Sequence, residues 1–295
     1  MDDEQLPLEI VAVWLLYVVD ALAILVTYSR LPARELYHVS GSGLNAGLSR
    51  VLVFSNFSTG LVAIAILALL ADRMRKRATI VAAVAGAILS AAVFWPGVVS
   101  EANLDARSVN ALSALGVLIA LVLTVLALRD GGAWSPRRRG DVVRIVVAVV
   151  ALVLALPWIA AEVGYFLNGA PLLGRVFETR HYPGHTLPAV HHGHHHGMDG
   201  VLLLLTALLL SRAVPAMRHR GLRIATGMYL ALMAAYGIGI AANDFWFEQV
   251  VKRGWTSWTI PNVLYPKASI AWAVIVLGAA ALYAVAARSQ GRLSG

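Results

Sequence analysis

The chain has 295 residues, of which 59% are hydrophobic and only 14% are charged. Soluble domains carry roughly 25% charged residues, so this composition excludes an ordinary soluble protein and predicts an integral membrane protein. The absence of cysteine excludes a disulfide framework and thiolate metal ligation. The net charge of +8 gathers in a few short loops, as is typical of membrane proteins, so we expect no nucleic-acid partner.

Apolar runs of roughly 20 residues follow one another along the chain, each long enough to cross a hydrocarbon core of about 30 Å. The first is too long for a signal-peptide core and lacks a basic segment before it, so we expect it to be retained. We expect eight spans, at about 7–29, 47–71, 78–99, 110–129, 141–168, 188–213, 222–243 and 266–287. The predicted fold is therefore an all-α membrane protein, a single polytopic bundle over 1–295.

Four basic clusters predict the orientation of this bundle. They are Arg73, Arg75, Lys76 and Arg77 after the second span, Arg137, Arg138 and Arg139 after the fourth, Arg212, Arg218, Arg220 and Arg223 around the turn after the sixth, and Arg288 and Arg292 after the eighth. With eight spans all four clusters fall on one side, which the positive-inside rule makes cytoplasmic. We expect a multi-pass protein of the cell membrane with both termini in the cytoplasm.

One stretch, His181 to Asp199, contains seven of the nine histidines. A second histidine recurs at the fourth residue three times, and Asp199 continues the step from His195. In a helix this spacing stacks imidazoles on one face, and Pro188 suits the first turn of such a helix. The expected metal ligands are His181, His185, His191, His192, His195 and His196. The predicted topology places them outside the cell, at the mouth of the sixth span.

Several polar groups lie at membrane depth, where an ionisable side chain is costly unless paired, hydrated or neutral. They are Asp20 in the first span, Asn56 in the second, Glu162 in the fifth, and Asp244 and Glu248 at the end of the seventh. The step of four from Asp244 to Glu248 predicts two carboxylates on one helical face. All belong to the outer level of the bilayer, as the histidines do. We therefore expect one composite site.

The ligand types indicate which metal this site would take. Imidazole suits zinc, copper, iron and nickel, and added carboxylate favours zinc or iron. A single zinc needs only three protein ligands, so the surplus of histidines predicts one or two metal ions, with iron or copper favoured and zinc possible. Glu162, Asp244 and Asp199 are the expected catalytic carboxylates.

Simpler interpretations stay open beside the metal site. A solvated histidine tract binds metal adventitiously, as an engineered tag does, and clustered imidazoles also serve as pH sensors. Asp20 can be a structural carboxylate, and Asp244 and Glu248 can pair with Lys252 or Arg253.

The paired histidines resemble the histidine boxes of membrane di-iron desaturases, hydroxylases and alkane monooxygenases, in which HxxxH and HxxHH elements ligate two irons. Those families spread their boxes over separate cytoplasmic segments, whereas here about twenty residues hold them all. Membrane zinc hydrolases of lipid amides are similar in having a bundle with His and Asp ligands. Their ordered series of Ser, Asp and HxxxH is not evident here. Both resemblances imply an analogy of chemistry and no family membership.

The leading functional expectation is a membrane metalloenzyme that oxidises an apolar or lipid-like substrate entering from the outer leaflet, with a redox partner as electron donor. A zinc version would hydrolyse lipids, with Glu162 or Asp199 as general base. The alternatives are a metal-ion or proton-coupled transporter, in which Asp20, Glu162 and Asp244 relay the ion, and an accessory subunit that delivers metal to a partner protein.

Overall fold

The computed structural model describes residues 5–30, 41–95, 98, 106–138, 140–156, 158–159, 178–179, 187–188, 196–251, 254–264 and 266–291. These residues are almost entirely helical. The α-helices are α1 (Leu8–Arg30), α3 (Leu44–Arg73), α4 (Arg77–Ser90), α5 (Asn110–Leu128), α6 (Asp141–Leu154), α9 (His196–Leu210), α10 (Arg220–Trp246) and α11 (Ile270–Gly291). Two 3₁₀ turns, Ala91–Phe94 and Val214–Ala216, follow α4 and α9, and a π-helical turn, Phe247–Val251, follows α10.

Seven helices of the described chain are long and apolar enough to span a membrane. They include α1, α5 and α10, whose bounds lie within a few residues of the predicted spans. The predicted span at 141–168 is described as α6 and then only at a few later positions. The chain is thus an all-helical protein with the features of a multi-pass membrane protein, and the eighth span remains a prediction.

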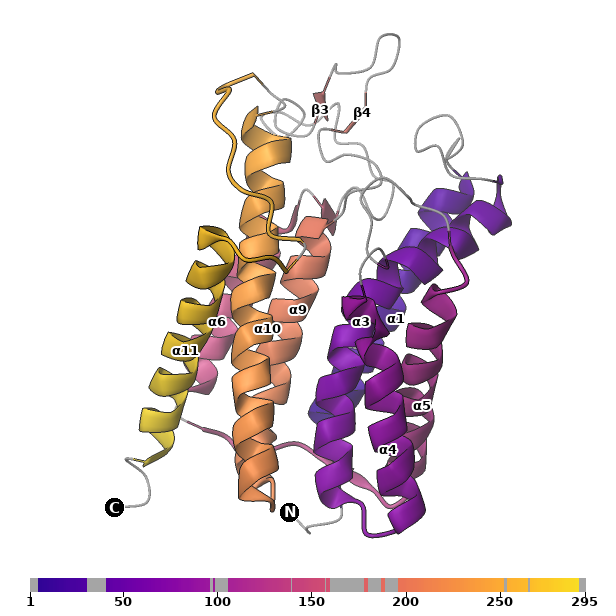
Figure 1. The fold of residues 1–295 in the computed structure, drawn as a ribbon, viewed down its shortest axis with the longest axis vertical. Coiled ribbons are helices and arrows are strands. Elements are labelled where there is room, and N and C mark those ends of the chain that lie inside the picture. The colour runs from indigo at the N-terminus through magenta and orange to yellow at the C-terminus, as the bar shows by residue number, and fades with distance from the viewer. Residues whose placement is uncertain are drawn as a thin grey trace.

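Two groups of helices make up the bundle. In Figure 1, α1, α3, α4 and α5 form the indigo to purple group, and α6, α9, α10 and α11 form the pink to yellow group. Within the groups the most extensive packing joins α9 to α10, α1 to α3, and α4 to α5. The two groups meet where α9 packs against α1 and α3 and where α10 packs against α3. The core therefore runs along this junction, with Ile66, Leu202 and Leu203 fully buried.

Glycines allow a close crossing of α9 and α10. A Cβ on Gly200 of α9 would lie 2.5 Å from the carbonyl oxygen of Gly237 on α10, and a Cβ on Gly237 would lie 2.4 Å from that of Gly200. Membrane helices associate through small residues of this kind, because apolar lipid gives no hydrophobic drive for helices to associate. The pair fixes α9 and α10 face to face.

The described members of the basic clusters lie at one end of the bundle, which we call the basic end. The turn between α3 and α4, the turn between α9 and α10, and the end of α11 all lie there (Figure 1). Strand β1 (Leu6–Pro7) pairs in parallel with β2 (Gly132–Ala133) at the same end, and Arg73 donates to the carbonyl of Gln5 at 2.6 Å. The basic residues that the sequence places on one side of the membrane therefore lie at one end of the bundle. The cytoplasmic location of this end stays a prediction.

A buried ion network ties the basic end together. Glu9 is fully buried, and its Oε1 lies 3.6 Å from Nε of Arg212 and accepts the backbone N–H of Ser135 at 3.0 Å. Arg212 also lies 3.5 Å from Asp141, which pairs with Arg144 at 3.1 Å. The network joins α1, α6 and the end of α9.

The prediction of a helix beginning at Pro188 is wrong. Leu187–Pro188 form strand β4, which pairs antiparallel with β3 (Glu178–Thr179), and α9 begins at His196. The fixed φ of proline fits extended backbone as well as a first helical turn, so the residue alone could not decide between them. Pro188 therefore gives no support to the prediction that one helix stacks His191 and His192 on His195 and His196.

Candidate functional site

A buried polar cluster lies where α1, α3 and α9 meet, at the part of the bundle away from the basic end. Of its members, Tyr17 and Asp20 belong to α1, Ser58 belongs to α3, and Asp199 and Thr206 belong to α9. The surroundings of the Tyr17 ring hydroxyl include Thr206, Ser58, Asp199 and Asp20. The cluster thus brings two carboxylates and three hydroxyls from three helices into one buried region.

The shortest contact of the polar cluster joins α3 to α9. Oγ of Ser58 donates to Oδ1 of Asp199 at 2.5 Å, and the two residues are 0% and 3% exposed. Hydrogen bonds to ionised carboxylates are shorter and stronger than neutral ones. Asp199 also lies in the first turn of α9, where the helix dipole favours a negative charge. The carboxylate of Asp199 therefore joins α3 to the beginning of α9.

His196 is the one residue of the predicted ligand set that the structure describes. Its Nδ1 lies 4.0 Å from Oδ2 of Asp199, and its side chain is 18% exposed. Two ligands of one ion, each bound at about 2.0–2.1 Å, can lie at most about 4.2 Å apart. The separation of 4.0 Å is close to this upper limit, whereas tetrahedral geometry places two such ligands about 3.4 Å apart, so the two side chains would have to move closer together to share an ion.

Within the described ranges, no group of three or more His, Asp or Glu side chains is placed to hold a metal ion. A complete site would need ligands from the rest of the histidine stretch. His181, His185, His191, His192 and His195 lie outside the described residues, as does Glu162. Of the expected composite site, the structure describes the side chains of Asp20, Asn56, His196, Asp199 and Asp244, and the site as a whole stays a prediction.

Asp244 lies on the other side of α9 and makes a different contact. Its Oδ2 accepts the Nε1–H of Trp158 at 2.7 Å, and both residues are buried. A Cβ on Gly197 would meet the Trp158 ring within 2.2 Å, so the indole lies directly against the first turn of α9. Asp244 is thus connected to the histidine end of α9 through Trp158.

Asn56 does not join the polar cluster through its amide. Its Nδ2 donates to the carbonyl oxygen of Asn110 at 2.7 Å, which joins α3 to the first residue of α5. This is a structural contact between two helices.

The expected pairing of Asp244 with Glu248 on one helical face crosses a change of helix type. Regular α-helix ends at Trp246, and Glu248 lies in the π-helical turn Phe247–Val251. The side chain of Glu248 lies outside the described part of the chain, so its place on the same face as Asp244 stays a prediction.

An apolar groove borders this region on the lipid-facing side. It has a volume of about 590 Å³ between α6, α9 and α10, and its walls include Val150, Leu204, Ile238 and Phe245. Trp158, Gly200 and Trp246 line it as well, so the groove reaches the indole that contacts both Asp244 and Gly197. Val150 and Ile238 are also about half exposed on the outer surface, which makes the groove continuous with the lipid-facing surface.

Sequence reasoning missed Tyr17, Ser58, Thr206 and Trp158. Tyr17 lies three residues before Asp20, a spacing that places both on one helical face, so this partner could have been found. Ser58 and Thr206 are single hydroxyl residues within apolar spans. Such residues commonly bond to their own helix or to a neighbour, and nothing local marks them as part of a site.

Comparisons with known proteins leave the chain without a match: no family model, no curated protein and no solved structure resembles it significantly.

Proposed function

We propose that the protein is an integral membrane metalloenzyme that oxidises an apolar, lipid-like substrate near the beginning of α9. The observation that supports this most is the groove between α6, α9 and α10. It is apolar along its length, borders the lipid-facing surface and reaches Trp158. Trp158 in turn packs against Gly197, the neighbour of His196.

His196 and Asp199 would hold the metal, together with ligands from His181 to His195 and from Glu162. Iron or copper in this set would supply the activation of oxygen, and zinc would instead supply a water of lowered pKa. Ser58 keeps Asp199 oriented by its 2.5 Å hydrogen bond. Partners of this kind fix a ligand and tune its basicity.

The groove would bind the hydrocarbon part of the substrate and keep water away from the reacting carbon. Its walls of Val, Leu, Ile and Phe side chains favour an alkyl or isoprenoid chain by burial of apolar area. The bond from Trp158 to Asp244 fixes the indole at the inner end of the groove. In this proposal Trp158 positions the substrate, and the carboxylate of Asp244 positions Trp158.

One observation favours a second candidate, proton-coupled transport. Tyr17 and Thr206 lie near the middles of α1 and α9, so the polar cluster continues from Asp199 toward the centre of the bundle. Hydroxyl groups accept and donate protons, and such chains mark proton relays in transporters. Asp20→Asn separates the two candidates, because a transporter should lose flux and an enzyme should retain metal and substrate conversion.

The proposed function is tested with tag-free protein, purified in detergent, loaded with iron or copper and incubated with membrane lipid extract under oxygen and a chemical reductant. Mass spectrometry should find a lipid that has gained one oxygen atom. Hydrolysed lipid with zinc bound would replace the oxidative version by the hydrolytic one. Retained metal without any conversion would reject the enzyme and favour transport or metal delivery.

A groove variant tests the access route separately. Val150→Trp should fill the groove and slow conversion at least about tenfold, the effect of losing about 1.4 kcal/mol of binding. Val149→Trp is the matched control, because Val149 is equally exposed on the same helix but does not line the groove. Equal rates for both variants would reject substrate entry along α6.

A further inference from the structure

A second pocket lies at the basic end, far from the histidine stretch. It has a volume of about 420 Å³ and lies between α3, α4, α5 and β1. A water molecule occupies about 30 Å³ in the liquid, so this space can take a polar group of several atoms together with part of a hydrocarbon chain. Its charged lining consists of Arg73, Arg75, Lys76 and Asp130, which gives the pocket a net positive charge.

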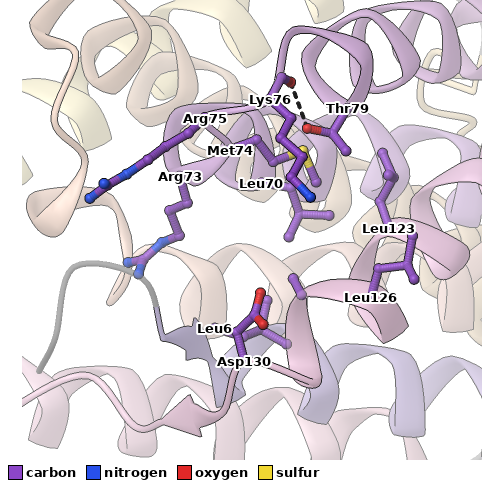
Figure 2. Close-up of a pocket in the computed structure, with 11 residues that line it drawn as sticks. Leu6, Leu70, Arg73, Met74, Arg75, Lys76, Thr79, Leu123, Leu126 and Asp130 are labelled. Atoms are coloured by element: carbon purple, nitrogen blue, oxygen red, sulfur yellow. Dashed lines mark hydrogen bonds between the residues drawn. The ribbon is translucent and has the colours of Figure 1, made fainter.

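The charged groups lie on different sides of this pocket. Figure 2 shows the Lys76 ammonium and the Asp130 carboxylate directed toward each other across the opening, whereas the Arg73 and Arg75 side chains extend away to one side. Arg73 is anchored by its bond to the carbonyl of Gln5 at 2.6 Å. Arg75 and Lys76 are exposed at the surface. These two long side chains can therefore follow a bound group.

The beginning of α4 adds to the attraction for an anion. Lys76 is its N-cap residue, Arg77 its first residue, and the first turn contains no acidic side chain. Helix N-termini favour negative charge, so two cations at this position are unfavourable by themselves. An anion bound between Lys76 and the beginning of α4 would offset both the repulsion between the two cations and their unfavourable interaction with the helix dipole.

The remaining walls of the pocket are apolar. Leu70, Met74, Leu123 and Leu126 line it below the charged groups, and Leu126 is also 43% exposed on the outer surface of α5. The apolar part therefore opens toward the hydrocarbon of the bilayer. A free phosphate ion would leave this part empty, whereas an acyl chain attached to the anion would fill it.

We propose that this pocket binds an anionic phospholipid of the adjoining leaflet, with the phosphate at the Lys76 ammonium, where the exposed side chain of Arg75 can turn to reach it, and an acyl chain along Leu123 and Leu126. Basic pockets between membrane helices bind anionic lipid head groups through the same chemistry. This proposal is independent of the function proposed for the histidine end, because no residue is shared between the two sites.

The test is lipid retention by the full chain, measured by native mass spectrometry after delipidation in detergent. Phosphatidylglycerol should bind at least about fivefold more tightly than phosphatidylcholine with the same acyl chains, an effect of about one basic contact. Lys76→Gln should lower phosphatidylglycerol affinity about fivefold. Arg77→Gln is the matched control, since Arg77 is a neighbouring exposed cation that does not line the pocket.

A variant of opposite sign sharpens the test. Asp130→Asn removes the one carboxylate of the lining and should raise phosphatidylglycerol affinity, so loss of folding cannot imitate the result. Equal binding of the two lipids, or equal losses in Lys76→Gln and Arg77→Gln, would overturn the proposal. Displacement of the lipid by inorganic phosphate at comparable concentration would assign the pocket to a soluble anion and overturn it too.

Discussion

The two ends of the bundle bury carboxylates in different surroundings. At the basic end Glu9 lies beside the guanidinium of Arg212, and Asp141 lies beside Arg144 and Arg212. At the other end Asp199 accepts from the hydroxyl of Ser58 and faces the imidazole of His196. A guanidinium stays charged at every physiological pH, whereas a hydroxyl is neutral and an imidazole titrates.

This difference separates a structural role from a chemical one. The pairs of Glu9 and Asp141 with arginine at the basic end carry their own compensating charge and hold helices together. Asp72, at the same end, accepts the backbone N–H groups of Arg218 and His219 and lies 2.9 Å from the imidazole of His219, so it also joins α3 to the beginning of α10.

Around Asp199 the described neighbours are hydroxyls, an imidazole and a second carboxylate, Asp20, a set that suits a bound cation or a transferable proton. We expect changes at the basic end to lower stability, and changes at Ser58 and Asp199 to lower metal retention.

The largest expected loss of stability follows Arg212→Gln. The change leaves the carboxylate of Glu9, which is fully buried, without its guanidinium, and breaking a buried pair in this way costs about 3–5 kcal/mol. Thermal unfolding followed by circular dichroism in detergent measures it. Arg220→Gln, at an exposed position nearby, should change stability little, and metal retention should stay at the wild-type level in both variants. Loss of metal from Arg212→Gln at temperatures where this variant is folded would contradict the assignment of a structural role to the basic end and a chemical role to the other end.

Next in size is Gly237→Ala, because its new methyl group would lie 2.4 Å from the carbonyl oxygen of Gly200. Overpacking of this kind costs about 1–3 kcal/mol. The control lies in the same helix: Gly221 has open space around it, so Gly221→Ala should raise helix stability by about 0.5–1 kcal/mol. Thermal unfolding of both variants should therefore shift in opposite directions. If Gly237→Ala left the unfolding temperature unchanged, α9 and α10 would separate easily, and the groove between them would not be a fixed feature.

Ser58→Ala tests the polar cluster itself. Hydrogen bonds to charged groups contribute about 1.5–3 kcal/mol, and those between membrane helices average about 0.6 kcal/mol, so we expect a loss of about 1–2 kcal/mol. Metal affinity should fall as well, by about tenfold for a lost partner of a ligand. Ser113→Ala is the control, because Oγ of Ser113 is buried without a hydrogen-bond partner in the described chain. Unchanged metal affinity in Ser58→Ala would place Asp199 outside the metal site.

The smallest expected effect comes from Trp158→Phe. The phenyl ring keeps most of the packing against Gly197 and Phe245 but loses the donor to Asp244, which should cost about 1 kcal/mol. Thermal unfolding measures this loss, and substrate conversion should fall further than stability if Trp158 positions the substrate. A loss of stability alone would limit Trp158 to a packing role.

The bundle could be predicted from the sequence because its cause is local. A bilayer requires runs of about 20 apolar residues, and cations gather at one end of the spans, so the bounds of α1, α5 and α10 and the shared end of Arg73 and Arg212 follow from reading the chain. The contact of Ser58 with Asp199 joins residues 141 apart. It depends on how α3 packs against α9, and apolar helices give no periodic signal for that.

The wrong helix start at Pro188 has a related origin. Proline suits the first turn of a helix, but the same backbone angle suits the strand that Pro188 forms with Glu178. The residue type permits two conformations, and the choice depends on a pairing partner elsewhere in the chain. In the same way, nothing local in the sequence marks the change from α- to π-helix at Phe247.

The most direct test of the account is the metal content of tag-free protein after mild chelator washing, with Asp199→Asn measured beside the wild type. Asparagine keeps the shape of the side chain and an acceptor for Ser58 but removes the charge. The account predicts one or two tightly held ions per chain in the wild type, iron or copper rather than zinc, and a clear loss in Asp199→Asn at unchanged folding. Absence of retained metal from the wild type, or equal content in the two proteins, would contradict it.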